Sequence, residues 1–342
     1  MNLRELSKLL GLSQTTVSRA LNGCPEVSEE TRAKARAAAD LHGYRPSAAA
    51  RRLATGQSGT LGVVFPGERN LLGDLLFTEF LGGCVERAAE LGYDVTLAMA
   101  RGAQTEETVY RRALRSARVD GMILSSPLIH DPRVDLLRTL KMPFILHGRS
   151  RTPTAYGHLD IDNEGAFHKA AKLLTDLGHR RIALLNGEAR YYFANAREQG
   201  FRRALAEKGF TAEANLMAGG LMIEKHGREE AIRLLDLPPT LRPTAILCSS
   251  LSQANGVLSV LTERGLRLGI DISLIAHDDR LQDMHAESFA TPLTATQSSI
   301  GAAGRRIVEL LIEHLRAPDA PLPEEVWPVD LVVRASTGPA PQ

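Results

Sequence analysis

Beyond residue 60 the chain alternates short apolar runs with longer segments in which apolar residues recur every three or four positions. The first pattern predicts buried strands and the second predicts amphipathic helices. The expected strands are Leu61–Phe65, Asp94–Met99, Gly121–Ser125, Phe144–His147, Ile182–Leu185, Ala245–Cys248 and Ile272–Ala276. The expected helices are Thr78–Leu91, Glu106–Ala117, Gly165–Leu177, Ala196–Lys208, Ser252–Arg264 and Ile300–Leu315. This alternation is typical of parallel sheets covered by helices on both faces, and its length exceeds one core, so two α/β lobes are expected.

The amino-terminal residues follow a different pattern, one of short helical turns. Leucines at positions 3, 6, 9 and 10 give one apolar face to a helix that Gly11 ends. Ser13 is a good N-cap for a second helix, Gln14–Leu21, and Ser28 is a good N-cap for a third that continues to Leu41. Two short helices joined by a glycine turn predict a helix-turn-helix.

The free face of the second helix is polar and basic. Its apolar positions would face inward and leave four polar side chains pointing outward, namely Gln14, Thr15, Ser18 and Arg19. Gln and Arg at the start of such a helix can bond to purine edges in the major groove, whereas Ser and Thr suit phosphates. Solvated surface alone gives the same polar pattern, so the prediction of DNA binding depends on the segment that follows.

Residues 46–56 predict a basic helix of marginal stability. Pro46 suits its start and Gly56 its end, and the segment is shorter than the ~12–15 residues that an isolated helix needs. It carries Arg51, Arg52 and one apolar side chain, Leu53. Leu53 can enter a base step in the minor groove while the arginines meet phosphates. The alternative is a plain interdomain linker, although such a linker would not need Leu53.

Charge is distributed unevenly along the chain. Residues 1–56 contain nine Lys or Arg against five Asp or Glu, whereas the whole chain contains 41 against 40. A basic amino-terminal module on a mildly acidic body predicts a nucleic-acid partner for that end only. The 44% hydrophobic content excludes wholesale disorder.

Targeting and catalytic motifs are missing from the sequence. The opening residues lack the apolar core of a signal peptide, and no stretch approaches the ~20 apolar residues of a membrane span, so a cytoplasmic protein is expected. Cys24, Cys84 and Cys248 have no CxxC spacing, which argues against a disulfide framework or a thiolate zinc site. There is no GxxxxGK[ST] loop and no GxSxG elbow. We therefore expect no enzyme, no cofactor and no metal.

Three sequence motifs, followed along the chain by the end of an alanine-rich segment, form a specific pattern. They are Leu10-Gly11-Leu12-Ser13-x-x-Thr16-Val17-Ser18-Arg19-x-Leu21-Asn22, Val27-Ser28-x-x-Thr31-Arg32, Gly43-Tyr44-x-Pro46 and the ending Arg52-Leu53-Ala54. In these residues the chain resembles the LacI-type (lactose repressor) family of transcription regulators. The resemblance implies that some side chains read bases, that others hold phosphate, and that Leu53 is the minor-groove wedge. The base readers are Gln14, Thr15 and Arg19, the phosphate contacts are Thr16, Ser18 and Asn22, and the full DNA-binding set adds Ser13, Ala50 and Leu53.

The resemblance extends to about Thr337. Val119-Asp120-Gly121-Met122-Ile123-Leu124, Asp160-Ile161-Asp162-Asn163-Glu164-Gly165-Ala166, Leu177-Gly178-His179-Arg180-Arg181-Ile182-Ala183 and Pro292-Leu293-Thr294 look like the family's periplasmic-sugar-binding-type core. We expect Asp162 to cap a helix and Gly178-His179 to close it.

The resulting domain prediction has four parts. A helix-turn-helix domain occupies residues 1–45, a hinge 46–57, an effector-binding and dimerisation core 58–337, and a tail 338–342 that we expect to be frayed. Within the core, the first lobe comprises about 58–160 and 294–318, and the second lobe about 161–293 and 324–337.

Candidate ligand residues follow from strand ends, because open parallel sheets bind ligands beyond the carboxyl ends of their strands. Strand ends give Asp74, Phe77, His147, Arg149, Ser250, His277 and Asp278. The resemblance adds Asn195 and Arg197, implies that Arg197 grips the effector, and implies that Asp278 binds effector hydroxyls. Carboxylates, arginines and amides around an aromatic ring suit a neutral polyol such as a sugar. The alternative for the run His277-Asp278-Asp279, which ends the last expected strand, is a loop cap or an interlobe salt bridge.

Two positions depart from the family pattern. Leu251 stands where many relatives carry an acidic residue, and His147 stands where several carry Asp, so ligand preference does not transfer directly. The triplet His147-Gly148-Arg149 is similar to regulators of α-glucoside use.

The sequence predicts a homodimeric repressor of carbohydrate-utilisation genes that binds a pseudo-palindromic operator in double-stranded DNA, since one helix-turn-helix reads too few base pairs. A small sugar-like effector between the lobes would control it, and no membrane partner is expected. The alternative is a cytoplasmic sugar-binding protein or sugar-acting enzyme with the same core, which would not explain residues 1–56.

Overall fold

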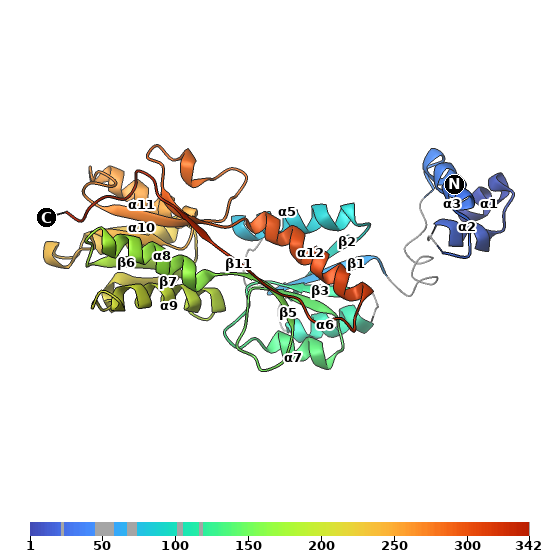
Figure 1. The fold of residues 1–342 in the computed structure, drawn as a ribbon, viewed down its shortest axis with the longest axis horizontal. Helices are drawn as coiled ribbons and strands as arrows, with labels where there is room; N and C mark the ends of the chain where they lie inside the picture. Colours follow the sequence, from blue (N-terminus) through green and yellow to red (C-terminus); the bar gives the residue numbers. More distant parts are fainter. Residues whose placement is uncertain (22–23, 45–57, 67–73, 101–104, 116–118, 342) are drawn as a thin grey trace.

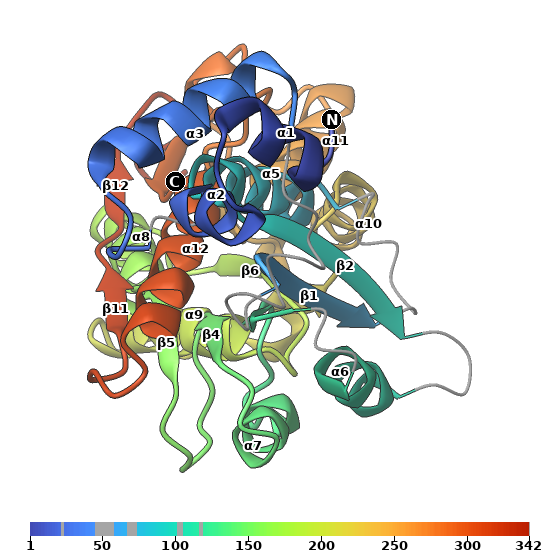
Figure 2. The same cartoon turned by 90° about the vertical axis from the view of Figure 1, so that its right-hand side faces the viewer.

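The computed structural model describes residues 1–21, 24–44, 58–66, 74–100, 105–115 and 119–341. A three-helix domain lies at one end of the molecule and two α/β lobes form the rest (Figure 1). Figure 2 looks from the end that carries the three helices. The predicted hinge lies outside the described residues, as do three members of the predicted DNA-binding set, Asn22, Ala50 and Leu53.

The three helices are α1 (Leu3–Leu10), α2 (Gln14–Leu21) and α3 (Glu29–Leu41). Local chemistry sets their ends: Gly11 adopts a left-handed conformation (φ 65°) after α1, and Oγ of Ser13 accepts a hydrogen bond from the amide of Thr16 at 3.0 Å. Their shared core is formed by five buried side chains, Leu6, Val17, Ala20, Ala35 and Ala39. The predicted helix-turn-helix is confirmed.

The first lobe is built on a six-stranded parallel sheet. In spatial order its strands are β11 (Glu324–Trp327), β5 (Gly157–Ile161), β4 (Phe144–His147), β3 (Gly121–Leu124), β1 (Thr60–Pro66) and β2 (Asp94–Ala100). Helices α5 (Leu75–Glu90) and α12 (Ile300–Arg316) pack on one face, and α6 (Glu106–Arg115) and α7 (Pro132–Thr139) pack on the other. Successive strand residues face opposite helix layers: Ile123 joins the first layer, while Met122 and Leu124 join the second.

The second lobe repeats this plan. Its strands are β12 (Asp330–Val332), β10 (Thr294–Gln297), β9 (Ser273–Asp278), β8 (Ala245–Cys248), β6 (Ile182–Gly187) and β7 (Met217–Gly220). All neighbours are parallel except the edge strand β12, which runs antiparallel to β10. The covering helices are α8 (Asn163–Asp176) and α9 (Tyr192–Ala206) on one face, and α10 (Glu224–Leu235) and α11 (Leu251–Glu263) on the other. Three short 3₁₀ turns complete the lobe: Ala214–Leu216, Pro239–Leu241 and Ala286–Ser288.

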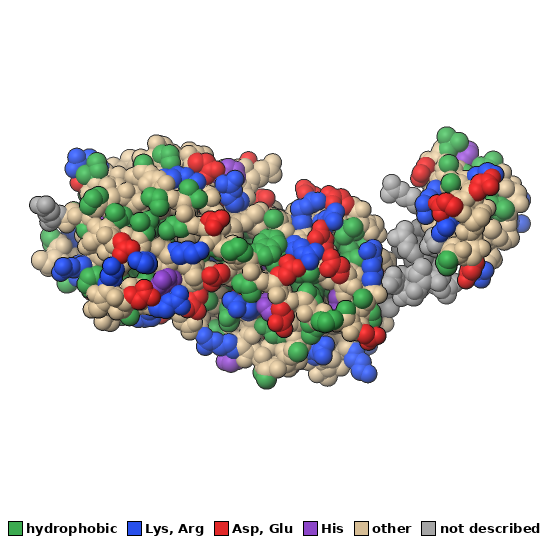
Figure 3. Space-filling view, viewed as in Figure 1, with side chains coloured by type: hydrophobic (Ala, Val, Ile, Leu, Met, Phe, Trp, Pro, Cys, Tyr) green, Lys and Arg blue, Asp and Glu red, His purple; other side chains and the backbone are tan. Residues whose placement is uncertain are grey.

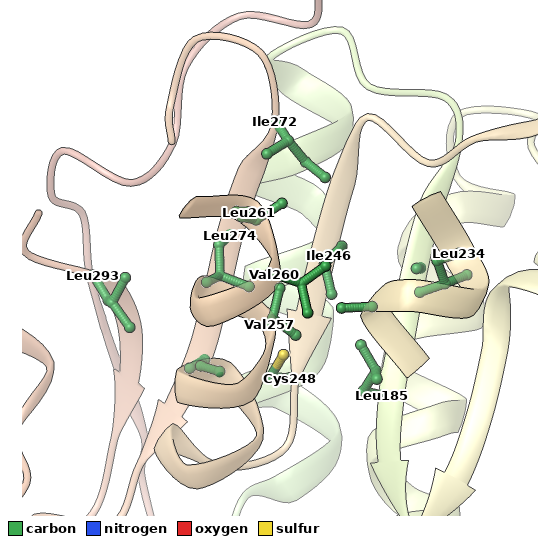
Figure 4. Close-up of a cluster of buried hydrophobic side chains, with 14 of the residues drawn as sticks. Leu185, Leu234, Ile246, Cys248, Val257, Val260, Leu261, Ile272, Leu274 and Leu293 are labelled. Carbon is green, nitrogen blue, oxygen red and sulfur yellow. The ribbon is translucent and has the colours of Figure 1, made fainter. Parts of the chain in front are cut away.

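Both lobes have cores of buried apolar side chains. In the second lobe, side chains of α11 such as Val257 and Val260 pack against Ile246 of β8 and Leu274 of β9 (Figure 4). Continuous burial on both faces of the central strands explains why they appear in the sequence as uninterrupted apolar runs.

Two lobe boundaries predicted from the sequence are wrong. β10 was expected in the first lobe, yet it lies in the second sheet, where Thr294 pairs in register with Ile275 of β9. β11 was expected in the second lobe, yet it extends the first sheet beside β5. β11 is a half-exposed edge strand with glutamates among its residues, so its sequence gives no strong apolar signal. The chain therefore crosses between lobes after β5, after β10 and after β11.

The expected frayed tail is also wrong for residues 338–341. The amide of Gly338 donates to Oγ of Ser273 at 3.1 Å, and the amide of Ala340 donates to the carbonyl of Leu177 at 2.9 Å. The buried imidazole of His179 contacts the carbonyl of Gly338 at 3.1 Å, so it joins the end of α8 to the tail. The two predicted capping roles are confirmed: Asp162 accepts from the amide of Gly165 at 2.8 Å, and the backbone of Gly178-His179 closes α8.

Candidate functional site

A cleft between the two lobes collects residues from the carboxyl ends of many strands. It encloses about 1220 Å³, with open solvent at its mouth included. A concave site between two lobes, lined by aromatic and polar side chains, is the usual form of a small-molecule site. The first lobe contributes the residues that follow β3, β4 and β5, and the second contributes those that follow β6, β7 and β9. Residues at strand ends thus line this cleft, as the sequence predicted, and the binding of an effector there stays a prediction.

Arg197 is the central cation of the cleft. It lies on α9, its exposed fraction is 5%, and it nevertheless contributes to the cleft lining. Nε donates to Oδ1 of Asn163 at 2.8 Å, and Nη1 donates to the carbonyl of Ser249 at 2.8 Å. The guanidinium also lies 4.9 Å from the ring centre of Phe167 and 5.1 Å from that of Phe193. Burial lowers the pKa of Arg197 to about 10, against the effect of Asp279 and Asp160, so the side chain stays charged at neutral pH.

Four carboxylates also line the cleft: Asp74, Asp160, Glu188 and Asp279. Three of them already have donors in the protein. Asp74 caps α5, Asp160 accepts from Nε of Arg149 at 2.7 Å, and Glu188 pairs with Arg190 at 2.9 Å. Arg197 is the one arginine among the described lining residues, and it already donates to Asn163 and Ser249, so the cleft favours hydroxyl groups over anions.

His147 supplies a neutral imidazole. Its ring stacks on Phe80 with centroids 4.5 Å apart and an interplanar angle of 17°. Burial lowers the pKa of His147 to about 4, although Asp160 and Asp279 act in the opposite direction. Its ring nitrogens make no hydrogen bond to the described part of the chain, so one can donate to a ligand hydroxyl and the other can accept.

The remaining walls are largely apolar or aromatic. Phe77 and Phe80 come from α5, and Phe193 comes from the first turn of α9. The loop after β7 adds Leu221, Met222 and Ile223. Aromatic faces beside hydrogen-bonding groups are what a sugar ring, with its apolar faces and polar rim, requires.

The structure brings together four of the nine predicted effector residues. Asp74, Phe77, His147 and Arg197 line the cleft, and the other five lie outside its lining. Arg149 donates a hydrogen bond to the cleft residue Asp160 without lining the cleft itself. Oδ1 of Asn195 accepts a hydrogen bond from Nη2 of Arg151 at 3.0 Å.

Ser250, His277 and Asp278 have structural roles. Ser250 caps α11 by accepting from the amide of Gln253 at 3.2 Å. β9 runs two residues beyond its predicted end, so His277 and Asp278 are still inside the strand and are fully buried. His277 bonds to Thr296 and Ser298, and Asp278 accepts from the amides of Arg280 and Ala286. Asp279, the next residue, is the one that reaches the cleft.

Sequence reasoning missed Asp160 and Asn163 as cleft residues because β5 was not predicted as a strand, so its end was not searched. It missed the loop after β7 for the same reason. β7, Met217–Gly220, contains two glycines and no β-branched residue, and its sequence gives no strand signal. Nothing in the sequence marked Phe193 as a cleft residue except its position shortly after the end of β6.

Hydrogen bonds join the two lobes at one lip of the cleft. The amide of Ile129 donates to the carbonyl of Arg190 at 3.1 Å, and the amide of Tyr192 donates to the carbonyl of Pro127 at 3.0 Å. Leu128 and Tyr191 form an antiparallel β-bridge between these bonds. The lobes therefore contact each other along backbone as well as through the three crossovers.

The outer face of α2 is the candidate DNA-contacting surface. Gln14, Thr15 and Arg19 are exposed, whereas Thr16 and Ser18 are half-buried. The hydroxyls of Ser13 and Thr16 bond to each other at 2.8 Å, and Arg19 lies 3.8 Å from the exposed carboxylate of Glu26. The prediction that the side chains of Gln14, Thr15 and Arg19 point outward is confirmed. Their contacts with DNA stay a prediction.

Acidic and basic side chains of the core are mixed on the face drawn in Figure 3. Across α5 and α12 they pair closely: Arg87 with Glu309 and Arg305 with Glu90, each at 2.7 Å. Such neutralised surface does not attract a polyanion in the way a basic patch would. Among the described residues no helix is both long and apolar enough to cross a bilayer, and no three His, Cys, Asp or Glu residues are grouped to hold a metal ion.

Comparisons with known proteins agree with this arrangement. A family model described as "Bacterial regulatory proteins, lacI family" matches residues 2–47, and one described as "Periplasmic binding protein-like domain" matches residues 171–337. The chain is 46% identical over 343 residues to the HTH-type transcriptional regulator AglR of Rhizobium meliloti (strain 1021), with 100% of this chain and 95% of that protein covered.

Two solved structures are similar over nearly the whole chain. The lac repressor dimer bound to operator and the anti-inducer ONPF is 26% identical with a TM-score of 0.80, and 99% of each chain is covered. The complex of the transcriptional regulator CelR with cellobiose is 26% identical with a TM-score of 0.71, and 98% of this chain and 99% of that chain are covered. These relatives are regulators of transcription and not enzymes. With its helix-turn-helix, its two-lobed core and these matches, the chain belongs to the lacI family of bacterial regulatory proteins.

Proposed function

We propose that this regulator is a repressor of carbohydrate-utilisation genes, that it binds operator DNA as a homodimer, and that a neutral sugar in the interlobe cleft controls it. The observation that carries the proposal is the joining, in one chain, of a helix-turn-helix to a two-lobed cleft lined by polar and aromatic side chains. In this assignment residues 1–45 bind DNA, 46–57 form the hinge and 58–337 bind the effector and dimerise. The protein acts in the cytoplasm, where a bacterial chromosome lies.

The proposed DNA contacts centre on α2. The exposed Gln14, Thr15 and Arg19 would read base edges, and the half-buried Thr16 and Ser18 would meet phosphates. Ser13 places its amide at the start of the same helix, a position that favours phosphate. Asn22, Ala50 and Leu53 remain part of the proposed DNA-binding set. The similar lac repressor was solved as a dimer on its operator, which supports a two-fold complex here.

The proposed effector is a neutral sugar. Carboxylates of Asp160 and Asp279, the guanidinium of Arg197 and the neutral ring of His147 offer hydrogen bonds to hydroxyls, and phenylalanines offer apolar faces. The similar regulator CelR was solved with cellobiose, which supports a disaccharide. Arg197, the one arginine among the described lining residues, already donates to Asn163 and Ser249, which argues against phosphorylated sugars.

The test pairs a ligand screen with a DNA screen on the full chain. A neutral disaccharide, maltose or cellobiose, is expected to raise the melting temperature, because a ligand present at ~100 times its Kd stabilises the folded state by about 2.7 kcal/mol. Glucose 6-phosphate should leave it unchanged. The same sugar should change the amount of inverted-repeat DNA that the protein retains from fragmented genomic DNA.

Arg197→Ala separates the two activities. It should abolish the sugar response and leave retention of DNA intact, because Arg197 lies in the cleft and the DNA contacts lie on α2. The control is Arg202→Ala on the same helix, where the lost arginine makes only exposed contacts with Glu198 and Met217. A response to phosphorylated sugars alone, or no preference for any DNA fragment, would contradict the proposal.

A further inference from the structure

Arg149 follows β4 in the first lobe, yet it does not line the cleft. The turn before it depends on Gly148, whose φ of 102° favours glycine, and the amide of Gly148 donates to the carbonyl of Leu159 at 2.7 Å. This turn directs the guanidinium to the carboxylate of Asp160, where Nε donates to Oδ2 at 2.7 Å. The side chain of Arg149 is 31% exposed and that of Asp160 only 5%. Arg149 therefore supports a cleft residue from outside.

The second oxygen of Asp160 continues the connection across the lobe boundary. Oδ1 accepts from Nδ2 of Asn163 at 3.2 Å and from the amide of Ile161 at 2.8 Å. Asn163, the first residue of α8 in the second lobe, uses its own Oδ1 to accept from Nε of Arg197 at 2.8 Å. Because the amide donates to a carboxylate at one end and accepts from a guanidinium at the other, its orientation is fixed. A continuous series of bonds thus runs from Arg149 to Arg197.

We propose that Arg149 is a positioning residue for the effector cleft: through Asp160 and Asn163 it sets the orientation of the Arg197 guanidinium. The inference rests on the proposed function, since Arg197 is the cation that would hold the sugar. It replaces the direct effector contact that the sequence suggested for Arg149.

Charge gives the reason why this arrangement needs Arg149. Asp160 is a buried carboxylate, and a buried charge that loses its partner is strongly unfavourable. With Arg149 in place, Asp160 is neutralised from the first lobe and Asn163 remains between it and Arg197. Without Arg149, the cation among the described lining residues that is left to interact with Asp160 is Arg197 itself, and its guanidinium would turn toward the carboxylate and away from Asn163.

A second contact makes Arg149 sensitive to the relative position of the lobes. Its Cζ lies 5.4 Å from the ring centre of Tyr192, the first residue of α9. Arg197 lies on the same helix. Arg149 therefore touches the helix that carries Arg197 as well as the carboxylate of Asp160. Separation of the lobes would break the contact with Tyr192, whereas the bond to Asp160 lies within the first lobe.

The test measures Arg197 in the ligand-free full chain. Hydrogen exchange of its Nε–H, followed by ¹⁵N NMR and assigned by its loss in Arg197→Lys, reports whether the bond to Asn163 is kept. Arg149→Gln should accelerate exchange by about tenfold, as expected for loss of a charge-assisted bond, and Arg149→Lys should accelerate it less. Arg202→Gln, which removes an exposed ion pair on α9, is the control and should leave the rate unchanged.

A second variant and a second readout complete the test. Asp160→Asn interrupts the same series of bonds one step further on and should accelerate exchange like Arg149→Gln. An unchanged rate in either folded variant contradicts the proposal. With maltose and cellobiose as probes, Arg149→Gln should raise the Kd of the sugar that binds by about tenfold. If neither sugar shifts the melting temperature of the unmodified protein, the proposed effector is wrong, and the exchange rate alone decides the role of Arg149.

Discussion

Individual side chains in the cleft hold their charge states through their surroundings. Arg197 keeps its charge with two hydrogen bonds and two aromatic rings around it, although burial lowers its pKa. His147 has lost its charge for the opposite reason: no carboxylate bonds to it within the described chain, and burial against Phe80 dominates. The contrast follows from geometry, because both residues lie near Asp160 and Asp279 and differ in their direct partners.

The low pKa of His147 makes stability depend on pH. In the unfolded chain the imidazole binds a proton near its ordinary pKa of 6.5, whereas in the folded protein it does so only near 4. Between these values the unfolded state holds more protons, so the free energy of unfolding falls as the pH falls from about 6.5 toward 4.

His147→Gln removes this titrating group and keeps a neutral polar side chain. Thermal or urea unfolding at pH 7 and pH 5 should show that the unmodified protein loses about 2 kcal/mol more than the variant. His158 and His179, whose pKa values burial also lowers, are present in both proteins and cancel in the comparison. Equal losses in the two proteins would contradict a neutral His147.

At the scale of elements, glycines set how closely neighbouring helices pack. α5 and α12 meet at Gly83, where an added Cβ would overlap the carbonyl oxygen of Gly301, and at Gly304, where it would overlap that of Phe80. Phe77 and Phe80 project from the same α5 into the cleft. The close contact of these helices therefore also fixes one aromatic wall of the site.

Adjacent glycines on α5 give a matched pair of substitutions. Gly83→Ala should lower the free energy of unfolding by about 1–3 kcal/mol, because α12 would have to move away. Gly82→Ala, one residue earlier, meets no heavy atom within 4 Å and should raise stability by about 0.5–1 kcal/mol through helix propensity. Urea unfolding of both variants checks the signs. A stable Gly83→Ala protein would mean that the two helices can separate at little cost.

At the scale of the whole molecule, the lip formed by residues 127–129 and 190–192 links the two lobes without any ligand. Its bonds join backbone groups, so they do not depend on particular side chains. Opening of the cleft must break them, which sets part of the free-energy difference between open and closed arrangements.

Tyr192 allows one of these bonds to be removed cleanly. It is the first residue of α9, where proline is tolerated, and Tyr191 before it is already extended (φ −86°, ψ 142°). Tyr192→Pro deletes the donor to Pro127, while Tyr192→Ala deletes the same ring and keeps the donor. Exchange of the Ile129 amide, which donates across the lip, should be about tenfold faster in Tyr192→Pro than in Tyr192→Ala. Equal rates would show that the lip opens independently of this bond.

The sequence by itself determined the helix-turn-helix and the alternation of strands and helices, and it pointed to residues at strand ends as the lining of a cleft. Each depends on local periodicity, on capping residues such as Ser13 and Asp162, or on runs of apolar residues buried on both faces. Arg197, His147, Phe77 and Asp74 were found in this way, with the family resemblance supplying Arg197.

Only the tertiary structure decided which lobe holds β10 and β11, and which polar residues face the cleft. Edge strands such as β7 and β11 have weak apolar patterns, and their places depend on pairing with strands far away in the chain. Asp278 and Asp279 differ by one position in sequence, yet one is buried inside β9 and the other lines the site, because the strand ends between them. The role proposed for Arg149 likewise depends on its bond to Asp160, which the fold creates and which no local sequence pattern predicts.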